Sequence, residues 1–379
     1  MSGSGWAFHN PTRVHFGAGA REKLGPMLAG KSVLVVTTRR GRAQLTKDRL
    51  LGASLPTGVV FVDTVLPNPG LADLQAGIDA LSDRRLDCVV GFGGGSALDA
   101  AKAYSVALAG EAPTRTLQTL IERPSDWSQL NAIPLIALPT TSGTGSEVTS
   151  FATVWDHENR RKLSLAGPAV SPHTAIVDPE LTHGLPMDAT ASTGLDALNQ
   201  ACESAWNRNA SPVTLAMAGR AIGLALRALS VLQSDLGNEA ARAELAEASL
   251  LAGLCISQTR TALCHSMSYP ITAHFGVSHG YACAFTMSAV AERAMAHDSA
   301  RFDDLARVAG YSGRGALLSA IADIVKQFDV SGIVRRAVPD SASLVALTGE
   351  MVTPGRADNY IVPLAPNAVG AILEQSYSS

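Results

Sequence analysis

The sequence lacks the features of a protein that binds nucleic acid, spans a membrane or is secreted. Lysine and arginine number 30 against 33 aspartate and glutamate residues, a net charge of −3, and a chain without basic excess is a poor partner for a phosphate backbone. No uninterrupted apolar run reaches the roughly 18–20 residues of a membrane span. Residues 1–14 contain no basic stretch followed by an apolar one, so no secretory signal is expected. We therefore expect a cytoplasmic protein that contacts neither nucleic acid nor membrane.

Cysteine is also scarce, and its spacing argues against its specialised uses. The five cysteines are odd in number and form no C-x-x-C pair, so neither a disulfide framework nor a zinc ribbon is expected. We interpret all five as reduced structural thiols: Cys88, Cys202, Cys255, Cys264 and Cys283. Apolar residues, in contrast, make up 46% of the 379 residues, which is enough for large cores at a length typical of two domains.

The first half of the chain, residues 1–185, alternates between short apolar runs and stretches with helical spacing. Strands are predicted at 33–37, 59–62, 88–91 and 134–138, and helices at 43–51, 71–81 and 96–109. This alternation predicts an α/β domain with a mostly parallel sheet covered by helices. Ligands of such sheets bind beyond the carboxyl ends of the strands.

The second half, residues 186–379, has a different pattern. Strand signals end after Asp178, and the chain becomes rich in alanine, leucine, serine and methionine at helical spacing. We therefore predict an all-α domain. Its later part is predicted to break at Gly310, Gly313, Gly332 and Pro339.

A glycine-rich loop follows the predicted strand 88–91. The string Gly93-Gly94-Gly95-Ser96 opens a helix that carries Asp99 and Lys102. Glycines let a phosphate approach backbone N–H groups at a helix N-terminus. The dinucleotide fingerprint G-x-G-x-x-G is not matched, because position 96 is serine. The residues alone leave open a turn that needs glycine only for close packing.

A second polar loop, Pro139–Glu147, follows the predicted strand 134–138. Its hydroxyls and its two glycines suit a ribose or a diphosphate, although an ordinary surface loop remains the alternative. The hydroxyl side chains concerned are Thr140, Thr141, Ser142 and Thr144. Two such loops on one sheet favour a ligand with two polar ends, as a dinucleotide has.

The helical half contains residues that could bind a metal. Asp196 and Gln200 are four residues apart and share a helix face, and two histidines follow at His265 and His279. One carboxylate, two imidazoles and an amide suit Fe²⁺ or Zn²⁺. Spacing alone leaves open that the two histidines are unrelated.

Taken together, these motifs resemble those of the iron-containing alcohol dehydrogenases. The string Gly93–Lys102 is similar to the family's GGGSxxDxAK cofactor loop, and Pro139–Glu147 is similar to its PTTxGTGSE loop. His265 and His279 fall where the family places two metal-binding histidines. The resemblance covers nearly the whole chain and implies the fold shared with dehydroquinate synthases.

The resemblance implies a separate function for each half of the chain and a reaction. Residues 1–185 would bind NAD(P), and residues 186–379 would bind the metal and the substrate. The family reaction is reversible hydride transfer between NAD(P)H and an aldehyde or ketone, with the metal polarising the carbonyl. The implied catalytic residues are Asp196, His265, His279 and Tyr269, and the implied metal ligands are Asp196, Gln200, His265 and His279.

The resemblance also implies the cofactor contacts. Asp99 would order the loop rather than touch phosphate. The implied set is Thr38, Asn68, Gly93, Gly94, Gly95, Ser96, Asp99, Thr140, Thr141, Ser142, Thr144 and Lys162. After the strand 33–37, where an acidic side chain would select NADH, the chain has Thr38-Arg39-Arg40. Hydroxyls and cations favour a 2′-phosphate, so we expect NADPH to be preferred and NADH tolerated.

Two positions depart from the family pattern. The usual metal site has an aspartate and three histidines, and Gln200 replaces the first histidine. An amide oxygen is a poorer ligand than imidazole, so either weaker metal binding or three protein ligands plus water is expected. Tyr269 replaces another family histidine. It could donate a proton to a developing alkoxide or serve only in packing.

The strings 151–156, 198–200, 203–207 and 265–270 resemble one branch of the family, the phosphonoacetaldehyde reductases. This implies reduction of phosphonoacetaldehyde to 2-hydroxyethylphosphonate. A phosphonate dianion favours arginine as its partner, and Arg356 and Arg208 are the candidates. A homodimer is also expected. The alternatives are a dehydrogenase for a simple short-chain alcohol or diol, a metal-free reductase, and an inactive nucleotide-binding protein.

Overall fold

The computed structural model describes residues 5–110, 116–127, 130–159 and 161–378. The chain divides into two compact units. The sheet unit comprises Asn10–Thr141 and Gly145–Gly184. The helical unit comprises Leu185–Ser379 together with Met1–His9 and Ser142–Thr144.

Six parallel strands form the centre of the sheet unit, in the order β1-β8-β5-β4-β2-β3. They are β1 (Arg13–Phe16), β2 (Val33–Thr37), β3 (Val60–Val62), β4 (Cys88–Gly93), β5 (Leu135–Pro139) and β8 (Thr174–Val177). Strands β2, β4 and β5 are buried along their whole length, which explains their continuous apolar runs. The predicted α/β domain with a parallel sheet is therefore confirmed.

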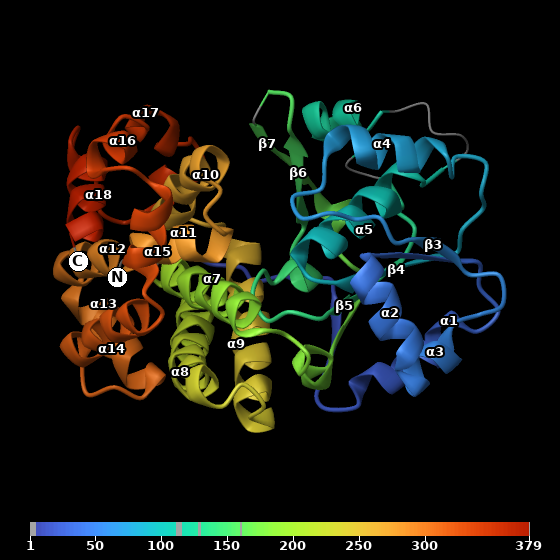
Figure 1. Ribbon diagram of the computed structural model, residues 1–379, viewed down its shortest axis with the longest axis horizontal. Helices are drawn as coiled ribbons and strands as arrows, with labels where there is room; N and C mark the ends of the chain where they lie inside the picture. Colours follow the sequence, from blue (N-terminus) through green and yellow to red (C-terminus); the bar gives the residue numbers. More distant parts are fainter. Residues whose placement is uncertain (1–4, 111–115, 128–129, 160, 379) are drawn as a thin grey trace. The chain divides into compact units, whose positions relative to one another are not determined.

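Helices cover both faces of this sheet. They are α1 (Leu24–Leu28), α2 (Arg39–Lys47), α3 (Arg49–Ser54), α4 (Leu71–Asp79), α5 (Gly95–Ala107) and α6 (Leu117–Glu122). Leu34 and Val36 of β2 belong to the core that includes α4, α5 and α6, whereas Val33 and Val35 belong to the core that includes α1, α2 and α3. Successive side chains of a strand point to opposite faces, so one apolar strand supplies both cores. Figure 1 shows α4 and α5 on one side of the sheet and α2 and α3 on the other.

Two local features of the sheet unit differ from the sequence-based prediction. The predicted helix 43–51 is interrupted at Asp48, whose side chain accepts hydrogen bonds from the N–H groups of Leu50 and Leu51 and so caps α3. An antiparallel pair, β6 (Phe151–Asp156) and β7 (Arg161–Ala166), was not predicted. Ala152, Val154 and Leu165 of this pair join the core beneath α5.

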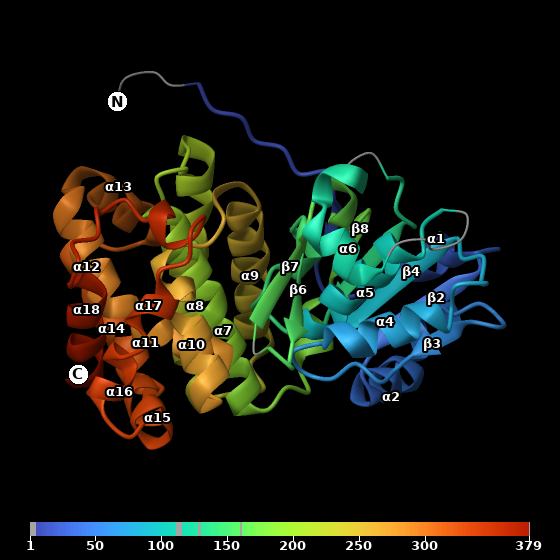
Figure 2. The ribbon, with the colours of Figure 1, turned by 90° about the horizontal axis from the view of Figure 1, so that it is seen from above.

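The helical unit contains α7 to α18. They are α7 (Met187–Ala205), α8 (Pro212–Ser234), α9 (Glu239–Thr259), α10 (Leu263–Phe275), α11 (His279–Phe285), α12 (Met287–His297), α13 (Ser299–Ala309), α14 (Arg314–Gln327), α15 (Val330–Ala337), α16 (Ser341–Val345), α17 (Thr348–Met351) and α18 (Ala368–Ser378). Helices α7, α8 and α9 pack side by side (Figure 2). The predicted all-α character is confirmed. The predicted break at Gly332 is wrong, because Gly332 lies inside α15 and the chain turns at Asp329 instead.

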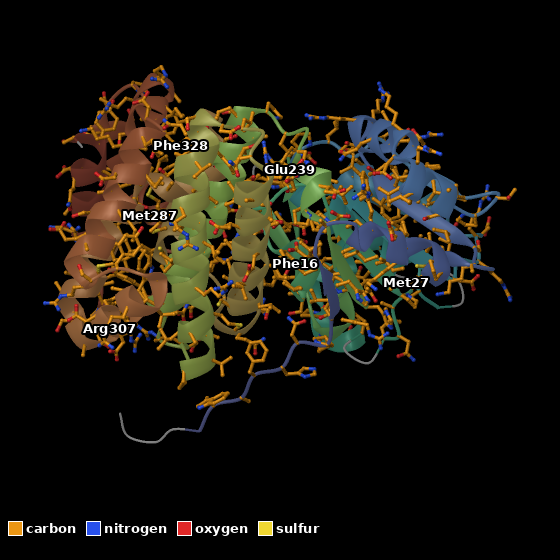
Figure 3. The ribbon with its side chains drawn as sticks, turned by 90° about the horizontal axis from the view of Figure 1, so that it is seen from below. Phe16, Met27, Glu239, Met287, Arg307 and Phe328 are labelled. Atoms are coloured by element: carbon orange, nitrogen blue, oxygen red, sulfur yellow. The ribbon has the colours of Figure 1, made fainter. Side chains whose placement is uncertain are left out.

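These helices surround one hydrophobic core, which includes Met287 and Phe328. Arg307 lies exposed on α13 (Figure 3). Short 3₁₀ helices complete the chain: η1 (Ala20–Lys23), η2 (Pro124–Trp127), η3 (Ser146–Val148), η4 (Pro168–Val170), η5 (Pro179–Thr182) and η6 (Ala357–Asn359). By length and composition alone, α8 is long and apolar enough to cross a membrane, although Arg220 and Arg227 interrupt its apolar residues. Because 61% of its most apolar window is buried inside the protein, it has the character of a core helix, and this is weak evidence for a span.

Candidate cofactor loops and metal centre

The strand order of the sheet reverses between β2 and β4, since the chain proceeds to β3 on one side and to β5 on the other. Such a switch point, at the carboxyl ends of the strands, is the usual ligand site of an open α/β sheet. The Thr37 hydroxyl donates to the Phe92 carbonyl at 2.6 Å and joins the two strand ends. Thr38 and the glycine loop Gly93–Ser96 therefore follow the two strands at this point.

The glycine loop has the geometry for both alternatives that the sequence left open, close packing and binding of an anion. Gly93 has φ 148°, and a Cβ there would lie 2.7 Å from Ala97 Cβ, so this position needs glycine for conformation and for packing. Gly94 is the N-cap of α5, and no side chain caps that helix end. The first-turn N–H groups of α5 are thus suited to an anion.

Polar side chains tie the neighbouring segments to this loop. Asp99 accepts hydrogen bonds from the Ser146 hydroxyl at 2.6 Å and from the Thr153 N–H at 2.8 Å. Asn68 has φ 58°, and its N–H donates to Ser96 Oγ at 3.3 Å. Asp99 thus has the contacts of a loop-ordering residue, and Asn68 lies beside the glycine loop.

The second polar loop, Pro139–Glu147, begins beside the glycine loop. The Thr140 N–H donates to the Gly93 carbonyl at 2.9 Å, and Thr141 Cγ2 lies 3.1 Å from the position of a Cβ at residue 94. Ser142–Thr144 is counted with the helical unit. Lys162 pairs with Trp155 across the β6–β7 hairpin, and the Trp155 N–H donates to the Pro69 carbonyl.

Two buried ionisable groups accompany these loops, Glu147 at the end of the loop Pro139–Glu147 and Lys102 on α5, and sequence reasoning gave them no role. Lys102 is fully buried and donates to Thr149 Oγ1 at 3.0 Å and to the Phe151 carbonyl at 2.8 Å. Burial lowers the pKa of Lys102 to about 8 and raises the pKa of Glu147 to about 7. Both groups are buried, and the two hydrogen bonds hold Lys102 in place.

In the helical unit, side chains from three helices converge on one point. Asp196 comes from α7, His265 from α10, and His279 and Cys283 from α11. One ligand atom of each lies within 4.8 Å of every other. Asp196 Oδ1 lies 3.3 Å from His265 Nε2, and Cys283 Sγ lies 3.7 Å from His279 Nε2. The structure thus brings together the predicted aspartate and both histidines, and adds a cysteine.

A carboxylate outside this cluster orients His265. Glu203, one turn after Gln200 on α7, lies 2.8 Å from His265 Nδ1. The same carboxylate accepts from the N–H groups of Ala262 and His265. Nδ1 is therefore engaged and Nε2 is turned toward Asp196, which is the arrangement of a metal-binding histidine with its supporting carboxylate.

Gln200 was expected to be a ligand, and the structure shows what its side chain does. Its amide Nε2 donates to Asp196 Oδ2 at 3.1 Å. Asp196 Oδ1 and Gln200 Oε1 are both buried and have no hydrogen-bond partner. Burial raises the pKa of Asp196, but the His265 and Gln200 contacts and the histidine charges outweigh it, so this pKa lies below its usual value.

These residues fit a divalent cation. An unpartnered buried carboxylate oxygen is costly unless it has a ligand. In a tetrahedral site with ligand bonds of about 2.0–2.3 Å, neighbouring ligand atoms lie about 3.3–3.6 Å apart, close to the 3.3 and 3.7 Å found within the cluster. Carboxylate, imidazole and thiolate are all zinc ligands, and the histidines and the carboxylate also suit iron.

The two arginines proposed to bind the phosphonate, Arg356 and Arg208, have different surroundings. Arg356 is half-buried, donates to the Tyr269 hydroxyl, and has its Cζ 5.1 Å from the centroid of the Tyr269 ring. The Tyr269 ring stacks on His279 with 5.9 Å between centroids. Arg208, in contrast, is exposed and donates to the Tyr360 carbonyl at 3.2 Å. Of these two arginines, only Arg356 is connected through Tyr269 to His279 of the candidate metal site.

Sequence reasoning missed Cys283 and Glu203. The spacing of four between His279 and Cys283, and of seven between Asp196 and Glu203, places each pair on one helix face. These spacings are the signals that could have revealed them. They were hidden because a cysteine in an apolar helix is usually structural.

Two family models match the chain in succession. Residues 11–179 match the iron-containing alcohol dehydrogenases, and residues 190–335 match the C-terminal part of the same family. The NADPH-dependent butanol dehydrogenase of Clostridium saccharobutylicum is 30% identical over 327 residues, which cover 85% of this chain and 83% of that enzyme.

The names of two other relatives specify a particular substrate. The phosphonoacetaldehyde reductase of Streptomyces viridochromogenes is 39% identical over 234 residues, which cover 61% of this chain and 58% of that reductase. This match spans less than two thirds of the reductase. The sulfoacetaldehyde reductase of Bifidobacterium kashiwanohense, solved in complex with NAD⁺, superimposes with a TM-score of 0.87 at 27% identity and complete coverage of both chains.

The structure combines a parallel-sheet unit with a helical unit that carries a cluster of possible metal ligands. The chain belongs to the iron-containing alcohol dehydrogenase family, whose members are NAD(P)-dependent alcohol dehydrogenases and aldehyde reductases with a metal site.

Proposed function

We propose that this protein reduces phosphonoacetaldehyde to 2-hydroxyethylphosphonate with NADPH. The observation that carries the proposal is the contact series from His279 through Tyr269 to Arg356, which joins a metal ligand to a guanidinium within one unit. A substrate with an aldehyde at one end and an anion at the other matches this series. The names of two relatives, a phosphonoacetaldehyde reductase and a sulfoacetaldehyde reductase, support the same substrate class.

In the proposed reaction, a bound cation and the cofactor supply part of the chemistry, and the side chains of the protein supply the rest. A bound divalent cation supplies Lewis acidity toward a carbonyl, and a reduced nicotinamide supplies hydride. Asp196, His265 and His279 would hold the cation, and Glu203 would keep His265 in the tautomer that presents Nε2. The Tyr269 hydroxyl would pass a proton to the developing alcohol, while Arg356 would neutralise the phosphonate.

The loops that follow β4 and β5 would bind most of the cofactor. Gly94, Gly95 and Ser96 at the start of α5 would hold the pyrophosphate, and Thr140, Thr141 and Thr144 the ribose on the nicotinamide side. Ser142, Asn68, Thr38 and Lys162 complete the proposed set, with Gly93 and Asp99 shaping the loop.

The preference for NADPH would depend on the arginines after β2. Arg40 donates to the Gly184 carbonyl at 2.7 Å, and Arg42 pairs with Asp63 at 2.8 Å. Arg39 is exposed in the first turn of α2, where a 2′-phosphate would find a guanidinium and a helix N-terminus. A cytoplasmic location is supported by the five free cysteines, and a homodimer stays a prediction.

A substrate panel tests the proposal. We expect kcat/KM to be highest for phosphonoacetaldehyde, lower for sulfoacetaldehyde, which carries one negative charge less, and lowest for propanal, with NADPH favoured over NADH. Equal or better reduction of propanal would contradict it. That result would favour the second candidate, a dehydrogenase for a simple short-chain alcohol, which the 85% coverage by the butanol dehydrogenase supports.

A further inference from the structure

We propose that the thiolate of Cys283 is the fourth protein ligand of the metal, and that Gln200 is not a ligand but holds Asp196 in position. The proposal rests on the metal site within the proposed function and is independent of the substrate. It replaces the expectation that Gln200 completes the site or that water does.

The position of the Cys283 sulfur supports this assignment. His279 and Cys283 are four residues apart on α11, so that one helix turn presents both to the same point. Cys283 Sγ lies 3.7 Å from His279 Nε2 and 3.8 Å from Nδ1, and the first distance is close to the separation of two ligands of one cation. Cys283 is fully buried, and its sulfur is within 4.8 Å of the ligand atoms of Asp196 and His265.

The side chain of Gln200 is oriented to hold Asp196. Its Nε2 donates to Asp196 Oδ2, which leaves Oδ1, the oxygen without a hydrogen-bond partner, turned toward His265. Glu203 acts on His265 Nδ1 in the same way. One face of α7 thus carries a ligand, Asp196, and two side chains that orient ligands, as supporting groups around metal sites do.

The ligand set has a chemical consequence. A carboxylate, two imidazoles and a thiolate form a set that suits zinc and cobalt better than the harder cations Mg²⁺ and Mn²⁺. On binding, the Cys283 thiol loses its proton to solvent and the sulfur lone pair forms the bond to the cation, so binding releases one proton from this group. No oxidant or reductant takes part.

X-ray absorption of the zinc-loaded wild-type protein tests the ligand set without any variant. The expected result is one sulfur scatterer at about 2.3 Å among nitrogen and oxygen scatterers at about 2.0–2.2 Å. A first shell without sulfur would overturn the assignment of Cys283. Because this measurement involves no substrate, it stays decisive even if the protein reduces a different aldehyde.

Cobalt-loaded variants test which thiol is responsible. Wild-type protein loaded with Co²⁺ should show thiolate-to-metal charge-transfer absorption in the near ultraviolet. Cys283→Ser should lose this absorption. The matched control is Cys255→Ser, because Cys255 is a buried thiol of α9 that donates to the Thr214 carbonyl, a bond that serine can keep. Retention of the absorption in Cys283→Ser, or its loss in Cys255→Ser, would contradict the proposal.

The role of Gln200 is tested in the same system. Gln200→Leu should keep the charge-transfer absorption and lower Co²⁺ affinity by about 10- to 100-fold, the usual effect of losing an orienting group. An unchanged affinity would show that Gln200 does not hold Asp196. A change in the sulfur signal would show that it shapes the first shell.

Discussion

Arg356 is the residue on which the proposed substrate class depends most. Its guanidinium contacts the Tyr269 ring and hydroxyl, whereas the alternative, Arg208, is exposed and bonded to a backbone carbonyl. The sequence could name both arginines but could not rank them, because nothing local in the chain indicates that residue 356 returns to residue 269.

Replacement of Arg356 tests this ranking. Arg356→Ala should raise KM for phosphonoacetaldehyde about 10- to 100-fold, since a charge-assisted hydrogen bond contributes about 1.5–3 kcal/mol. KM for propanal should change less than about twofold by the same reasoning, because propanal has no anion to pair. Steady-state kinetics on both aldehydes measure this, with Arg208→Ala as the matched control. Equal losses on both substrates would remove Arg356 from the role.

The buried carboxyl of Glu147 should make the stability of the protein depend on pH. Its folded pKa of about 7 lies above the ordinary 4.5, because burial disfavours the carboxylate. The folded state therefore binds more protons than the unfolded state between these values, and the stability that Glu147 contributes is full below pH 4.5 and is lost as the pH rises through 7.

Glu147→Gln should remove this dependence. Between pH 5 and pH 7.5 the melting temperature of the variant should improve relative to that of the wild type, since glutamine has no charge to bury. Thermal unfolding at a series of pH values measures the difference. A constant difference across the range would mean that Glu147 does not titrate in this window.

At the scale of elements, the turn from β4 into α5 was predictable and its surroundings were not. The buried strand and the glycines after it are local signals, and both were found within two residues. The β6–β7 hairpin was missed because its partly exposed, polar strands lack a continuous apolar run. The false break at Gly332 shows that an isolated glycine inside a helix is tolerated when the helix is fixed by packing.

Gly93→Ala tests the demands of that turn. Because φ is 148° and the new Cβ would lie 2.7 Å from Ala97 Cβ, we expect a destabilisation of about 1–3 kcal/mol together with weaker NADPH binding. Chemical denaturation and fluorescence titration of NADPH measure the two effects. Gly30→Ala is the control, because Gly30 also has a positive φ, 73°, but has nothing within 4 Å of its Cβ position. If the two variants bound NADPH equally well, the close approach at Gly93 would have no role in the cofactor loop.

At the scale of the whole molecule, the sequence was sufficient for the family and the two kinds of unit, because motifs and periodicity are local. It was insufficient for the cluster of possible metal ligands, which is assembled from α7, α10 and α11 and includes residues separated by 87 positions, Asp196 and Cys283. The proposed roles of Gln200 and Cys283 were not predictable for this reason, because only the packing of the helices determines which side chain reaches the centre.

The central claim is that a cation bound by this cluster is required for hydride transfer to an aldehyde. The most direct measurement is the rate of NADPH oxidation with phosphonoacetaldehyde by the same preparation before metal stripping, after it, and after return of Zn²⁺ or Fe²⁺. The account predicts a fall of at least about a hundredfold on stripping, with NADPH binding intact, and recovery on reloading. Full activity in the metal-free protein would contradict it.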